Sequence, residues 1–165
     1  MNSLHPTTTE TLALPSGRSV SVPKATPTFA RWRKPVKRLY GKRMLDFEGR
    51  LSVAELNILG LLKHEGWDGV WVDTWRKLFW TGLGDEPQRS LPERPSSIPE
   101  KIWDLAKIKA GVWDVFAWKG DRVLFCESKR SKHDSIQDSQ REFADYVLDA
   151  GLPLESLMLV EWREV

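Results

Sequence analysis

Asp114, Glu127 and Lys129 are the residues of this 165-residue sequence whose types and spacing could do chemistry. Each acid belongs to an apolar run, and the dipeptide Gly120-Asp121 between the runs is typical of a two-residue β-hairpin loop. If this pair forms the loop, Asp114 lies directly opposite Glu127, so the two side chains share one face of the hairpin. Lys129 is two residues beyond Glu127 and therefore points to the same face.

Two carboxylates at directly opposite positions repel each other, and a raised pKa, a neighbouring cation or a bound metal ion relieves this repulsion. Lys129 supplies part of the compensation, and a divalent cation would supply more, because Mg²⁺ prefers carboxylate oxygens. Such a cation polarises a phosphoryl oxygen and activates water. The pattern therefore indicates phosphodiester hydrolysis, with Asp114 and Glu127 as metal ligands and Lys129 placed beside the attacking water.

A second interpretation needs no catalysis. The acids would form the polar end of an otherwise buried sheet, and Lys129 would form an ion pair with one of them. The tripeptide E-x-K is common in strands, and a register slip of one residue would separate Asp114 from Glu127.

The remaining sequence predicts an α/β protein. We expect, in chain order, a helix over 51–66, a strand over 69–75, a long loop over 81–99, a short helix over 99–109, the two hairpin strands, a helix over 135–150 and a strand over 156–162. This order implies a mixed sheet with helices packed against it. Residues 1–30 are rich in Thr, Ser and Pro, so we expect them to be flexible. The predicted organisation is a flexible basic segment over 1–45 and a catalytic domain over 46–165, with an insert at about 76–110.

The motif residues resemble the PD-(D/E)xK nuclease superfamily and, more narrowly, the VRR-NUC domain. The matching stretches are GVWD (Gly111–Asp114), ESK (Glu127–Lys129), Gln140 and the closing LMLVEW. The family often has proline where this sequence has Trp113, but that proline shapes the backbone and binds no metal. The resemblance implies a restriction-endonuclease-like αβββαβ core, a mixed four-stranded sheet flanked by helices.

The resemblance also implies roles for site residues. Asp114 and Glu127 would ligate Mg²⁺ or Mn²⁺, the backbone carbonyl of Ser128 would be a further ligand, and Lys129 would serve the attacking water. An acid on the first helix often completes such a site, and Glu55 is the candidate. Glu55 also lies three residues after Ser52, and the two would form a capping box if Ser52 began that helix.

Gln140 has two interpretations as well. It falls on an apolar helix stripe, where a glutamine needs hydrogen-bond partners. It is either a core amide bonded to a backbone carbonyl or a functional group that bonds Lys129, a metal-bound water or a DNA phosphate.

The basic residues are concentrated near the N-terminus. Residues 1–45 contain nine Lys or Arg and one acid, hence a charge of +8, while the whole chain carries +2. Basic side chains mixed with aromatic rings suit a polyanion, although a solvated linker has the same composition. The residues expected to contact nucleic acid are Arg130, Lys132 and His133 after the second hairpin strand, and Arg31, Arg33, Lys34, Lys37 and Arg38.

These observations predict a metal-dependent nuclease that hydrolyses DNA and selects its substrate by structure rather than sequence. The alternatives are a non-catalytic nucleic-acid-binding module of the same fold, an RNA nuclease, and an α/β interaction domain without activity. We expect a cytoplasmic protein, because no apolar run approaches the ~20 residues of a membrane helix. A small nuclease of this kind often works as a homodimer or with a partner replication or repair protein.

Overall fold

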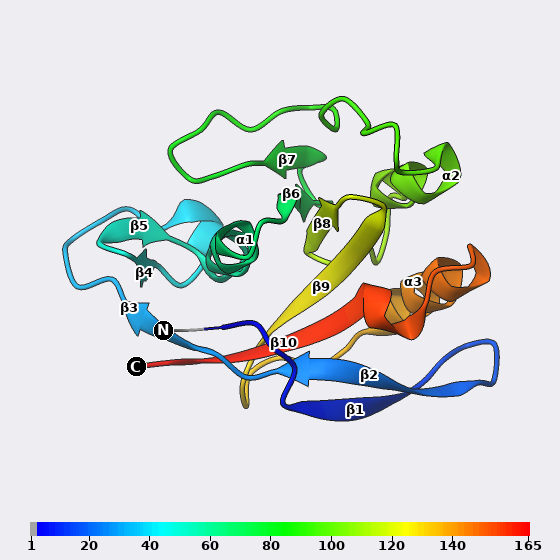
Figure 1. Cartoon of the computed structure of the whole chain (residues 1–165). Coiled ribbons are helices and arrows are strands. Elements are labelled where there is room, and N and C mark those ends of the chain that lie inside the picture. Colours follow the sequence, from blue (N-terminus) through cyan, green and yellow to red (C-terminus); the bar gives the residue numbers. More distant parts are fainter. Residues whose placement is uncertain (1–2) are drawn as a thin grey trace.

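The computed structural model describes residues 3–165, which form ten strands and three α-helices around one mixed sheet (Figure 1). The strands are β1 (Thr8–Ala13), β2 (Ser19–Ala25), β3 (Thr28–Arg31), β4 (Leu45–Phe47), β5 (Arg50–Ser52), β6 (Asp68–Asp73), β7 (Leu78–Trp80), β8 (Val115–Lys119), β9 (Arg122–Arg130) and β10 (Leu157–Glu164). The helices are α1 (Ala54–His64), α2 (Glu100–Trp103) and α3 (Asp138–Asp149), with 3₁₀ turns η1 (Leu39–Gly41), η2 (Asp104–Lys107) and η3 (Leu154–Ser156).

The centre of the sheet consists of β6, β8, β9 and β10 in that spatial order. β8 is antiparallel to both β6 and β9, whereas β10 runs parallel to β9 because α3 connects them. Lys119 lies opposite Arg122 and Val115 lies opposite Cys126, with Gly120 in the loop at a φ of +63°. The register predicted from the Gly-Asp pair is confirmed.

Strand periodicity produces two apolar clusters, one on each face of the central strands. On one face, Phe116 and Phe125 stack with ring centroids 4.7 Å apart, and Phe143 of α3 packs edge-on against Phe125. On the other face, residues such as Val115 and Cys126 pack in the same cluster as the buried side of α1. Figure 1 shows α1 and α3 on either side of β9 and β10. The two helices therefore approach the hairpin from opposite faces.

The predicted element order is present, but the sheet is larger than the four strands expected. The order α1, β6, β8, β9, α3, β10 matches the prediction, and β7 and α2 fall inside the expected insert at about 76–110. β7 pairs with β6, and the α2 region buries Ile102 and Trp103. On the other side of β10, five further strands extend the sheet. The chain is thus a mixed α/β protein built on one large sheet.

The prediction of a flexible segment was wrong for residues 3–31, while residues 1–2 lie outside the described part. β1 and β2 form an antiparallel hairpin, β2 pairs with β10 in parallel at Leu159 and Val160, and β3 pairs with β10 further along. Leu12 and Val22 are buried in the cluster that faces α3. The sequence gives little sign of this, because β2 and β3 take their partner from β10, more than 120 residues away.

No helix within residues 3–165 is both long and apolar enough to cross a membrane.

Candidate metal-binding active site

The hairpin brings Asp114 and Glu127 together at one end of the central strands. The backbone N–H of Asp114 donates to Glu127 Oε2 over 3.3 Å, and the backbone N–H of Ser128 donates to Asp114 Oδ2 over 2.9 Å. The carbonyl of Asp114 accepts a hydrogen bond of 2.7 Å from Val72, which fixes this residue to β6. The two acids therefore sit on a backbone held from both neighbouring strands.

Both carboxylates lie in surroundings that disfavour their charged forms. Burial, followed by the charge of Glu55, raises the pKa of Asp114 to about 7, although the Ser128 N–H, Lys42 and Lys129 oppose this shift. Glu127 is 1% exposed, and burial together with the charge of Asp114 raises its pKa well above the usual range. A divalent cation would favour the ionised forms of both groups.

Lys129 and Gln140 form a hydrogen-bonded network with Glu127. Lys129 Nζ lies 3.0 Å from Glu127 Oε1 and donates to Gln140 Oε1 over 2.9 Å. Gln140 Nε2 donates to Glu127 Oε1 over 2.6 Å. Of the two interpretations of Gln140, the structure shows the contact with Lys129 rather than a core amide bonded to a backbone carbonyl.

The same glutamine fixes the start of α3. Its Oε1 accepts from the backbone N–H of Gln137, and the Gln137 side chain binds the N–H of Gln140, so the two form a capping box. The indole N–H of Trp113 donates to the Gln140 carbonyl over 3.0 Å. Trp113 thus anchors α3 against the hairpin.

Gly111 permits this close approach. Its φ is +72°, and a Cβ at this position would lie 2.0 Å from the carbonyl oxygen of Ser139 in the first turn of α3. Any side chain here would push α3, and Gln140 with it, away from Lys129.

Glu55 of α1 is 7% exposed, and its charge acts on Asp114. The predicted capping box with Ser52 was wrong, because Ser52 of β5 pairs with Leu45 of β4. Helix α1 begins after Val53, and no side chain of the described residues caps it. The Glu55 carboxylate instead accepts from Lys42 Nζ over 2.5 Å. Helix capping therefore does not compete for the Glu55 carboxylate, although Lys42 does.

Sequence analysis missed Lys42 and Asp73 as parts of this site. Lys42 Nζ lies 5.2 Å from the centroid of the Trp71 ring, and the charges of Glu55, Asp114 and Asp73 act on it. Asp73 is buried at the end of β6. The sequence signal for Asp73 was its place as an acid at the end of a predicted strand. Nothing in the sequence distinguished Lys42 from the other basic residues around it.

The donor set fits Mg²⁺ or Mn²⁺ in an open site, whose remaining ligands would be water or substrate phosphate. Within residues 3–165, no three His, Cys, Asp or Glu side chains converge closely enough to hold a metal ion. Mg²⁺ needs no such cage, because it commonly binds through one or two carboxylates together with substrate phosphates and water. Glu127 is buried and Asp114 is half-buried, both carboxyl groups have raised pKa values, and Glu55 is near enough to act on the charge of Asp114.

The residues expected to contact nucleic acid divide into two groups. Arg130 is half-buried with its guanidinium 5.8 Å from the Trp162 ring centroid, and Lys132 and His133 are exposed in the turn that follows β9. The second group is exposed at the end of β3 and in the segment leading to η1: Arg31, Arg33, Lys34, Lys37 and Arg38. Within residues 3–165, neither group forms a hydrogen bond or ion pair with Asp114 or Glu127.

Comparisons of the chain with protein-family models, with curated proteins and with solved structures give no match. The likeness to the VRR-NUC domain therefore rests on the motif residues alone, and the function must be argued from the site.

Proposed function

We propose that this protein is a metal-dependent nuclease that hydrolyses phosphodiester bonds in DNA, with a PD-(D/E)xK core of the VRR-NUC kind. The observation that carries the proposal is the placement of the half-buried Asp114 and the buried Glu127 together, beside Lys129. Acids in a purely structural surface ion pair would be exposed and ionised, whereas these two have raised pKa values. Holding both carboxylates in these surroundings without a cation costs stability, and cation binding would offset that cost.

The chain's own residues have distinct roles in this proposal. Asp114, Glu127 and the Ser128 carbonyl would bind Mg²⁺ or Mn²⁺, with Glu55 available from α1. The bound ion would polarise a phosphoryl oxygen and acidify water. Lys129 would orient the attacking water, and Gln140 holds the Lys129 ammonium in place through its 2.9 Å hydrogen bond.

DNA is the proposed substrate, and selection by structure rather than base sequence agrees with the exposed positive side chains. Arginine and lysine side chains contact phosphates, and phosphate contacts carry no sequence information directly.

A non-catalytic nucleic-acid-binding module is the second candidate, and Lys42 is the observation that favours it. Its ammonium group neutralises Glu55 and attracts Asp114. A permanently bound ammonium would reduce the need of these acids for a metal ion. Such a module would bind DNA equally well in a chelator and leave it intact.

Cleavage assays separate the two candidates. Linear, flapped and branched DNAs and one matching RNA are incubated with the protein in Mg²⁺, in Mn²⁺ and in EDTA. We expect DNA cleavage that requires the metal and is lost in Lys129→Ala, while Glu155→Gln, an exposed acid next to the opposite end of β10, keeps wild-type activity. Metal-independent binding without any cleavage would favour the second candidate, and cleavage of the RNA alone would reject DNA as the substrate.

A further inference from the structure

A basic pocket of about 750 Å³ lies between the end of β10 and the segment that links β3 to β4. This volume is within the ~300–1,000 Å³ typical of pockets for small ligands. Its lining residues are Arg31, Trp32, Arg33, Lys34, Pro35, Val36, Arg38, Arg43, Met44, Glu164 and Val165. Five side chains of this wall are therefore cationic and one is acidic.

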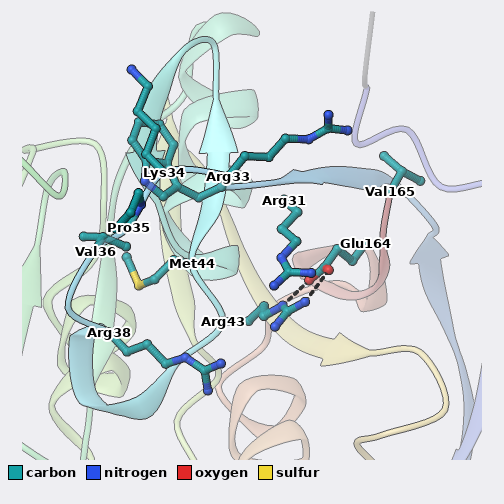
Figure 2. A pocket seen from close by; sticks show the side chains of 11 residues that line it. Arg31, Arg33, Lys34, Pro35, Val36, Arg38, Arg43, Met44, Glu164 and Val165 are labelled. Carbon is teal, nitrogen blue, oxygen red and sulfur yellow. Dashed lines mark hydrogen bonds and ion pairs between the residues drawn. The ribbon is translucent and has the colours of Figure 1, made fainter.

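Three guanidinium groups converge in this pocket. Figure 2 shows those of Arg31, Arg38 and Arg43 directed into the same space, whereas the ends of Arg33 and Lys34 point away from it. Arg43 is held by Glu164, whose Oε1 accepts from Nη2 over 2.5 Å. Within the described residues 3–165, Arg31 and Arg38 form no ion pair with a carboxylate. The pocket thus holds positive charge that the folded chain does not neutralise.

The pocket and the candidate active site lie toward the same end of β9 and β10. Arg130 follows Lys129 at the end of β9 and lies opposite Trp162 on β10. Glu164, whose pKa is lowered by Arg43 and more weakly by Arg130 and Arg31, is two residues further along β10. Because Glu127 lies opposite Leu159, the two sites are separated along the strand by roughly 16 Å, at about 3.3 Å per residue.

Three converging guanidinium groups suit the phosphorylated end of a nucleic-acid strand better than its interior. An internal phosphodiester carries one charge and two free oxygens, and proteins follow a strand of them with cations arranged along a groove. A terminal phosphate carries close to two charges and three acceptor oxygens, which is the chemistry that a cluster of arginines recognises. Val36 and Met44 add apolar wall that suits the sugar or base of the last nucleotide.

We propose that this pocket binds the terminal phosphate of a nucleic-acid strand and so makes the protein a reader of phosphorylated DNA ends. This inference rests on the proposed function, because the pocket would hold the end of the DNA strand that the active site cuts. The cut would then fall at a fixed short distance from that end.

Binding is tested in EDTA, where no cleavage occurs, by the fluorescence anisotropy of internally labelled DNA oligonucleotides. The oligonucleotides carry a 5′-phosphate, a 3′-phosphate or hydroxyl groups at both ends. We expect one kind of phosphorylated end to bind about tenfold more tightly than the hydroxyl end, since charge-assisted hydrogen bonds are gained. Arg31→Gln and Arg38→Gln should each remove most of this preference, and inorganic phosphate should compete for it.

Arg122→Gln is the matched control, because it removes the same charge at the opposite end of β9. It should keep the end preference. Equal binding of phosphorylated and hydroxyl ends, or a preference that survives both pocket substitutions, would overturn the inference. Metal-dependent cleavage without an end preference would reject the pocket and leave the nuclease standing. An end preference without cleavage would reject the nuclease and leave the phosphate-binding pocket standing.

Discussion

Lys42 Nζ lies 2.5 Å from Glu55 Oε1, so the acid that α1 directs at the candidate site already has a cationic partner. The same ammonium group is attracted by Asp114 and Asp73. Lys42 belongs to the segment between η1 and β4, whereas Glu55 belongs to α1. A lysine from outside the core elements thus acts as a counter-ion within the site, and a divalent cation would have to compete with it.

Lys42→Met should strengthen metal binding. Removing one positive charge beside the acids lowers the Kd for Mn²⁺ by roughly tenfold, because the ion no longer meets that repulsion. In EDTA the same variant loses about 1–3 kcal/mol of unfolding free energy, since Glu55 becomes a buried group without its partner. Titration calorimetry and thermal unfolding measure the two effects. Lys119→Met removes an exposed lysine at the hairpin turn. It should leave the Kd for Mn²⁺ unchanged and the ion pair between Lys42 and Glu55 intact. An unchanged or weaker Mn²⁺ affinity in Lys42→Met contradicts this account.

Gln140 and Gln137 separate helix capping from the chemistry of the site. Each side chain contributes one half of the capping box, so Gln140→Ala and Gln137→Ala should each cost about 0.5–2 kcal/mol of stability. Gln140 alone holds Lys129 and Glu127. We therefore expect kcat to fall by roughly tenfold or more in Gln140→Ala and to stay near wild type in Gln137→Ala. Equal activities for the two variants, measured at matched folded fractions, would show that Gln140 has no role beyond the cap.

Gly111→Ala should displace α3. The added Cβ would lie 2.0 Å from the Ser139 carbonyl, so the first turn of the helix must shift. Gly120→Ala is the control, because Gly120 also has a positive φ, at +63°, but has open space around it. We expect Gly120→Ala to lose about 1–2 kcal/mol from backbone strain alone and Gly111→Ala to lose more and to impair cleavage. Similar unfolding free energies for the two variants would argue against close packing at Gly111.

The raised pKa of Asp114 predicts how stability depends on pH. The folded pKa of about 7 exceeds the usual 3.8, so the folded protein binds more protons than the unfolded chain between these values. Without metal, this group makes the free energy of unfolding fall as pH rises from about 4 to about 7 and then level off. Asp114→Asn should lack this component. Because bound metal requires the ionised acids, Mn²⁺ affinity should rise over the same range. Chemical denaturation at several pH values in EDTA checks the first effect, and identical pH profiles for wild type and Asp114→Asn would contradict it.

The centre of the fold could be predicted from sequence because its signals are local. Gly120-Asp121 and the alternation around it specify the hairpin register, and the register places Asp114 opposite Glu127. The N-terminal strands could not be found this way. Their apolar positions, such as Leu12 and Val22, are few, and β10, which joins β2 and β3 to the sheet, is distant in sequence.

The site showed the same limit at Ser52 and Lys42. Ser52 has the right spacing from Glu55 for a capping box, but pairing with Leu45 holds it in an extended strand. Lys42 is one of nine basic residues in its segment of 45, and its contact with Glu55 depends on how β4 and β5 fold back against α1. Tertiary contacts decided both outcomes, and a pattern read along the chain contains no information about them.

The central claim is that Asp114 and Glu127 hold one divalent cation between them, and calorimetric titration with Mn²⁺ tests it most directly. The wild type should show a saturable site, and Asp114→Asn and Glu127→Gln should each weaken it by roughly 10–100-fold or more while remaining folded. Wild-type Mn²⁺ affinity in both variants would contradict the claim, whatever activity the protein has.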